Sequence, residues 1–87
     1  MIITREIYAP IIANYTKYIG KGAISKIVVQ QLDKHSRIVA KKVGMDINKE
    51  INPYSLFVYC EREGIENHEV VELLKCVKTV VAIAESS

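Results

Sequence analysis

A long two-faced run of residues, from about Ala23 to Val43, constrains the fold of this chain most strongly. At about 100° per residue, its large apolar side chains fall on one arc, as expected for an amphipathic helix. This arc comprises Ile24, Ile27, Val28, Leu32, Ile38, Val39 and Val43. Gly44 suits the left-handed position after a helix, and Lys41 and Lys42 suit the negative end of a helix dipole. The pattern therefore predicts a helix that buries this arc.

Three further segments have helical spacing. The first is expected to begin near Pro10 and to end before Gly20, because proline is favoured at the first helical position. The residues before it, "IITREI", predict either a short strand or an irregular arm. Asn52-Pro53 predicts the start of a third helix that Gly64 ends.

Asn67 is a suitable cap for a fourth helix, whose last part, "TVVAIA", is rich enough in β-branched residues to be a strand instead. At 87 residues, with 49% apolar and 25% charged residues, the chain is expected to form one globular domain, residues 1–87. The fold class expected is a small all-α bundle of about four helices, with the strand or arm at its N-terminus left open.

The sequence offers no sign of a membrane protein or of a secreted one. No apolar run approaches the roughly 20 residues that a membrane span requires. The N-terminus lacks the basic and apolar regions of a signal peptide, and two cysteines are too few for a disulfide scaffold. We therefore expect a cytoplasmic protein without membrane partners.

Charge is divided unevenly along the chain. Residues 1–49 contain nine basic and three acidic residues, whereas residues 50–87 contain three basic and seven acidic residues. The two parts thus carry net charges of +6 and −4. Such a division is typical of a polyanion-binding half, and it also fits electrostatic complementarity between the two halves.

The stretch "YIGKGAISK", residues 18–26, is a candidate phosphate-binding loop because two glycines and two lysines precede a helix. A Walker-type loop needs four residues between its first glycine and a Gly-Lys-Ser/Thr end, and this spacing is absent. The simpler interpretation is a turn, in which Gly20 ends one helix and Gly22 lets the chain reverse.

Basic side chains at helical spacing form a stripe on the second predicted helix, opposite its apolar arc. A stripe of this kind can follow phosphates over roughly three helical turns, although Asp33 is placed to pair with Arg37 and weaken it. With the lysine of the preceding turn, the candidate nucleic-acid-binding residues are Lys21, Lys26, Lys34, Arg37 and Lys41.

No catalytic or metal-binding pattern is present. His35 is expected to be a core or interface histidine, and Cys60 and Cys76 are expected to be buried thiols. The cysteines and histidines lack the paired spacing of a zinc site, and no nucleophile, base or cofactor fingerprint occurs at a convincing spacing. We therefore expect neither enzymatic activity, nor a metal, nor a cofactor.

The function expected is that of a small non-enzymatic DNA-associated protein, either a regulator or an accessory subunit of a DNA-processing complex. The basic half would contact the phosphate backbone, and the acidic helical hairpin of residues 50–87 would contact a protein partner or a second copy. The alternative is a protein–protein interaction adaptor or accessory subunit with no direct nucleic-acid contact.

Overall fold

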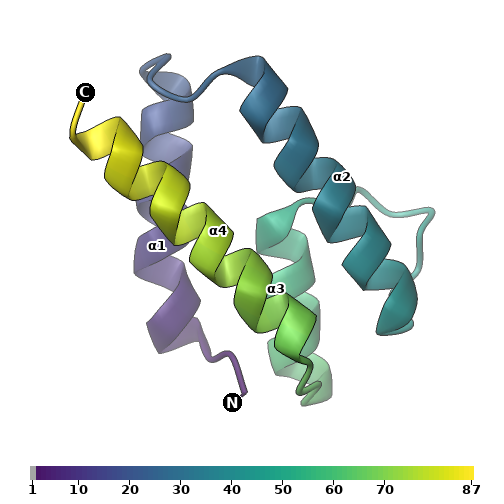
Figure 1. Ribbon diagram of the computed structural model, residues 1–87. Helices are drawn as coiled ribbons and strands as arrows, with labels where there is room; N and C mark the ends of the chain where they lie inside the picture. Colours follow the sequence, from purple (N-terminus) through teal and green to yellow (C-terminus); the bar gives the residue numbers. More distant parts are fainter. Residues whose placement is uncertain (1) are drawn as a thin grey trace.

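The computed structural model describes residues 2–87 and confirms a small all-α bundle (Figure 1). No strand occurs between residues 2 and 87, so the "IITREI" and "TVVAIA" segments are not strands. The helices, in chain order, are α1 (Arg5–Gly20), α2 (Lys26–Lys42), α3 (Pro53–Glu63) and α4 (His68–Glu85).

The prediction that the first helix begins near Pro10 was wrong, because α1 begins five residues earlier, at Arg5. Thr4 provides no side-chain cap for this helix. Instead, Glu61 of α3 accepts a hydrogen bond of 2.6 Å from the Arg5 backbone N–H and one of 3.4 Å from the Tyr8 hydroxyl. A carboxylate at a helix N-terminus satisfies a free donor and complements the dipole, so this contact helps a helix with an internal proline to extend back to Arg5.

The other helix boundaries follow local signals. The Ser25 hydroxyl accepts from the Val28 N–H at 3.3 Å, which starts α2 three residues later than expected. Asn52 forms a capping box with Ser55, and Asn67 caps α4 by accepting from Glu69 N–H. Gly44 and Gly64 follow α2 and α3 in the left-handed conformation, with φ of 82° and 66°.

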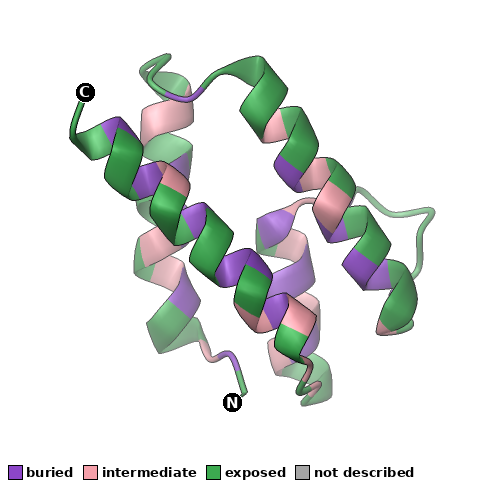
Figure 2. Ribbon diagram, viewed as in Figure 1, coloured by how far each residue is buried: buried purple, intermediate pink, exposed green. Residues whose placement is uncertain are grey.

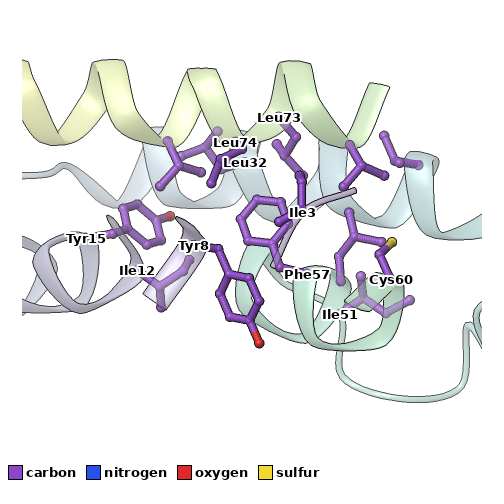
Figure 3. Close-up of a cluster of buried hydrophobic side chains, with 14 of the residues drawn as sticks. Ile3, Tyr8, Ile12, Tyr15, Leu32, Ile51, Phe57, Cys60, Leu73 and Leu74 are labelled. Atoms are coloured by element: carbon purple, nitrogen blue, oxygen red, sulfur yellow. The ribbon is translucent and has the colours of Figure 1, made fainter. Parts of the chain in front are cut away.

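The helices form two layers, with α2 and α4 on one side and α1 and α3 on the other (Figure 1). Both α1 and α2 contact α3 and α4, and the Cα envelope is only 17 Å thick. Phe57 and Leu73 are fully buried between the layers, and the Tyr8 ring lies 5.8 Å from the Phe57 ring, measured between centroids (Figure 3). No helix of residues 2–87 combines the length and the apolar character needed to cross a bilayer.

The buried side of α2 differs from the apolar arc predicted for it. Leu32 and Val39 are buried as expected, but Ile27, Val28 and Ile38 are exposed. Instead, the adjacent side of α2 packs into the core. This side carries the small residues Ser36 and Ala40, both fully buried. Ser36 satisfies its hydroxyl by donating to the Leu32 carbonyl at 2.7 Å. Small side chains let a helix approach its neighbours closely, and this leaves part of the apolar arc facing outwards (Figure 2).

Candidate nucleic-acid interface

The five predicted basic residues are all exposed, and we call them the basic stripe: Lys21, Lys26, Lys34, Arg37 and Lys41. The last four lie on α2, and Lys21 lies in the turn between α1 and α2. At 1.5 Å per residue, the α2 part extends over about 22 Å. The structure thus brings the predicted residues onto one helix and the turn that precedes it.

The basic stripe lies on a side of α2 that α4 does not cover. Lys42 marks the side facing α4, because its ammonium contacts both carboxylate oxygens of Glu69 at 3.0 Å. This hydrogen bond holds the pKa of Glu69 below its usual value. The stripe is centred about a third of a turn further round the helix from Lys42. The acidic part of the chain is therefore linked to α2 beside the stripe and leaves the stripe itself open.

The predicted pairing of Asp33 with Arg37 does not occur. Asp33 is half-buried, and burial and the charge of Glu50 raise the pKa of its carboxyl. Its charge also contributes, after burial, to raising the pKa of Tyr15 to about 12. Within residues 2–87, none of the five stripe residues forms an ion pair. Their charges are available to an external anion.

The glycine-rich segment is a helix–helix turn, as its simpler interpretation expects. Gly22 takes the left-handed conformation, with φ of 74°, and Ser25 then caps α2. The ammonium groups of Lys17 and Lys21 lie 5.4 Å and 6.0 Å from the centroid of the Tyr18 ring. Lys17 therefore adds a further exposed cation beside the end of the stripe.

An open cleft of about 470 Å³ lies between this turn and the start of α2. Ile19, Ile24 and Val29 supply its apolar walls, and Lys26 and Gln30 of the basic side also line it. This cleft lacks the residue spacing of a phosphate-binding loop. The positive charge of the candidate interface therefore comes from the lysine and arginine side chains of the basic stripe.

The cysteines and histidines form no ligand cluster. Cys60 is buried, and burial raises its pKa to about 11. Cys76 is exposed, so the prediction of two buried thiols was wrong for Cys76, which lies on the outer side of α4. His35 is half-buried. Across the described part of the chain, no three His, Cys, Asp or Glu residues are grouped so as to hold a metal ion.

Comparisons of this chain with protein-family models, with curated proteins and with solved structures gave no match.

Proposed function

We propose that this chain is a small, non-enzymatic DNA-associated protein that contacts the phosphate backbone through the basic stripe. The observation that supports the proposal most directly is the stripe itself: five exposed cations without an ion-pair partner in residues 2–87. Unpaired cations at helical spacing gain more from a polyanion than paired ones, because no internal contact has to be broken.

The contact would be electrostatic and would not depend on base sequence. Duplex DNA releases condensed counterions when lysine and arginine neutralise its phosphates. The stripe residues are long, exposed side chains on one helix and its preceding turn, an arrangement that follows a backbone. Acidic side chains of the other half, such as Glu63 and Glu72, would be repelled by phosphates and would stay away from the DNA. A regulator or an accessory subunit of a DNA-processing complex is the role that fits such a contact.

Titration of a fluorescently labelled duplex at several salt concentrations tests this proposal. Five phosphate contacts predict a slope of about −4.5 in a plot of log K against log salt concentration. Raising the salt fourfold should then weaken binding by a factor of several hundred, on the order of 500. Absent binding at low salt, or binding that salt does not weaken, would overturn the proposal.

A further inference from the structure

A second surface, which adjoins the basic stripe at Lys34, lies over the outer sides of α2 and α4. Ile27 and Ile38 of α2 are 70% and 48% exposed, and Ile83 of α4 is 65% exposed. Val28 of α2 and Val80 of α4 lie with Ile83 in a cleft between the two helices. The two helices lie on the same side of the molecule (Figures 1 and 2). We call this surface the α2–α4 face: Ile27, Val28, Ile38, Val80 and Ile83.

The face includes a cleft between the two helices. The cleft has a volume of about 270 Å³ and is lined by Val28, Val80 and Ile83, with Ile24 and Ala84 among its other walls. This volume is below the ~300–1,000 Å³ of most small-molecule pockets, so it suits inserted side chains more than a whole ligand. Ile27 and Ile38 extend the apolar surface along α2 by three turns, or about 16 Å.

These dimensions fit a helix. An amphipathic helix places its apolar side chains at i, i+3 or i+4, i+7 and i+11, so three turns of such a helix match the eleven-residue separation of Ile27 and Ile38 on α2. Ile83 of α4 lines the cleft on one side, and Ile27 of α2 is next in sequence to Val28, which lines it on the other side. An extended peptide would find no free strand edge in residues 2–87 with which to pair.

Charges around the face indicate the chemistry of the helix that it accepts. Lys34 lies on α2 between Ile27 and Ile38, is exposed, and has no ion-pair partner within residues 2–87. The nearby carboxylates of α4 are already paired, Glu69 with Lys42 at 3.0 Å and Glu72 with Lys75 at 3.5 Å. The unneutralised charge beside the face is therefore positive. A second copy of this chain would bring its own Lys34 and would be repelled.

We infer that the α2–α4 face binds an amphipathic helix of a protein partner, with apolar residues on one side and glutamate or aspartate along the flank that meets α2. The inference does not require DNA binding, because its apolar residues are outside the basic stripe and only Lys34 belongs to both surfaces. It also places the protein contact across α2 and α4, so that only the α4 part of the hairpin of residues 50–87 takes part in it.

Two synthetic helical peptides test the inference directly. They share one apolar face of leucine and isoleucine and differ only in their flanking residues, which are glutamate in one peptide and lysine in the other. Each is titrated into the ¹⁵N-labelled 87-residue chain, followed by amide chemical shifts. We expect the glutamate peptide to bind at least about tenfold more tightly, with the largest shifts at the five residues of the α2–α4 face.

A matched pair of variants locates the contact. Ile27→Ser/Ile83→Ser should weaken binding of the glutamate peptide about tenfold or more, because two apolar contacts are lost. Ile2→Ser/Ile47→Ser removes two other exposed isoleucines, 45% and 39% exposed, and should leave the affinity unchanged. All four side chains are exposed, so both variants are expected to fold, which circular dichroism checks.

Several results would overturn the inference. They are no binding of the glutamate peptide, equal binding of both peptides, or equal weakening by the two double variants. Sedimentation equilibrium adds one more: a dimer of the chain that Ile27→Ser/Ile83→Ser dissociates would make a second copy the occupant of the face. Because no nucleic acid is present in these experiments, their failure leaves the DNA proposal to be judged by its own titration.

Discussion

At the scale of single residues, Asp33 lies between the core and the basic stripe. Burial and the charge of Glu50 raise the pKa of its carboxyl in the folded chain. The folded state therefore binds the Asp33 proton more tightly than the unfolded state does. Ionisation of Asp33 at neutral pH consequently lowers the free energy of unfolding, and this loss disappears as the pH falls below the ordinary pKa of an aspartate.

Asp33→Asn removes this ionisation and should raise the melting temperature at pH 7. The gain should vanish near about pH 3, where Asp33 is protonated in both states. Thermal unfolding followed by circular dichroism at the two pH values measures the difference. Asp46→Asn is the control, because exposed Asp46 accepts only a local hydrogen bond from the Asn48 N–H, which asparagine can also accept. A lower melting temperature of Asp33→Asn at pH 7 would contradict the assignment.

At the scale of the helices, the start of α1 depends on a residue 56 positions away in the chain, because Glu61 accepts from the Arg5 N–H at 2.6 Å. Glu61→Ala should lower the free energy of unfolding by about 1–2 kcal/mol, the usual effect of losing a helix cap. Amide exchange should also become faster in the first turn of α1. Urea denaturation measures the stability, and Glu63→Ala, whose side chain is exposed and contacts only the adjacent Arg62, should change it by less than about 0.5 kcal/mol. Equal losses in the two variants would argue against a cap by Glu61.

Local signals explain which helix boundaries could be predicted from the sequence. The capping residues of α3 and α4 belong to the helix ends that they cap: Asn52 and Gly64 for α3, and Asn67 for α4. Their residue types are therefore sufficient to place these boundaries. The cap of α1 comes from Glu61, and no local pattern shows that a carboxylate of another helix will lie there. The pattern also could not show which part of the apolar arc of α2 meets the core, since that depends on how closely Ser36 and Ala40 approach neighbouring helices.

The candidate site was also predictable only where it depends on local sequence. Spacing alone placed the four stripe residues of α2 on one side of a helix, and the structure shows that they are exposed. Their lack of ion pairs was not predictable, because Asp33 is at the right spacing for Arg37 but is half-buried and forms no ion pair with it. The α2–α4 face was missed because the sequence assigns Ile27, Val28 and Ile38 to the core.

At the scale of the whole molecule, the two-layer arrangement leaves three different sides on α2. One side packs into the core, a second carries the basic stripe, and a third contributes to the α2–α4 face, with Lys34 at the border of the last two. The pair between Lys42 and Glu69 connects the basic and acidic parts of the chain without covering the stripe. This separation permits an electrostatic contact and an apolar contact on neighbouring sides of the same helix.

The most direct test of the central claim compares two double variants in the duplex titration. Lys34→Gln/Arg37→Gln removes two cations of the stripe, and Lys75→Gln/Lys78→Gln removes two exposed cations of α4 at the same three-residue spacing. Both variants lower the net charge equally, so a difference between them reports the position of the charges. We predict that the stripe variant makes the salt slope shallower by about 1.8, or 0.9 for each lost phosphate contact, while the α4 variant keeps the slope of the unmodified chain. Equal changes in both variants, or no change in the stripe variant, would contradict the assignment of the DNA contact to this side of α2.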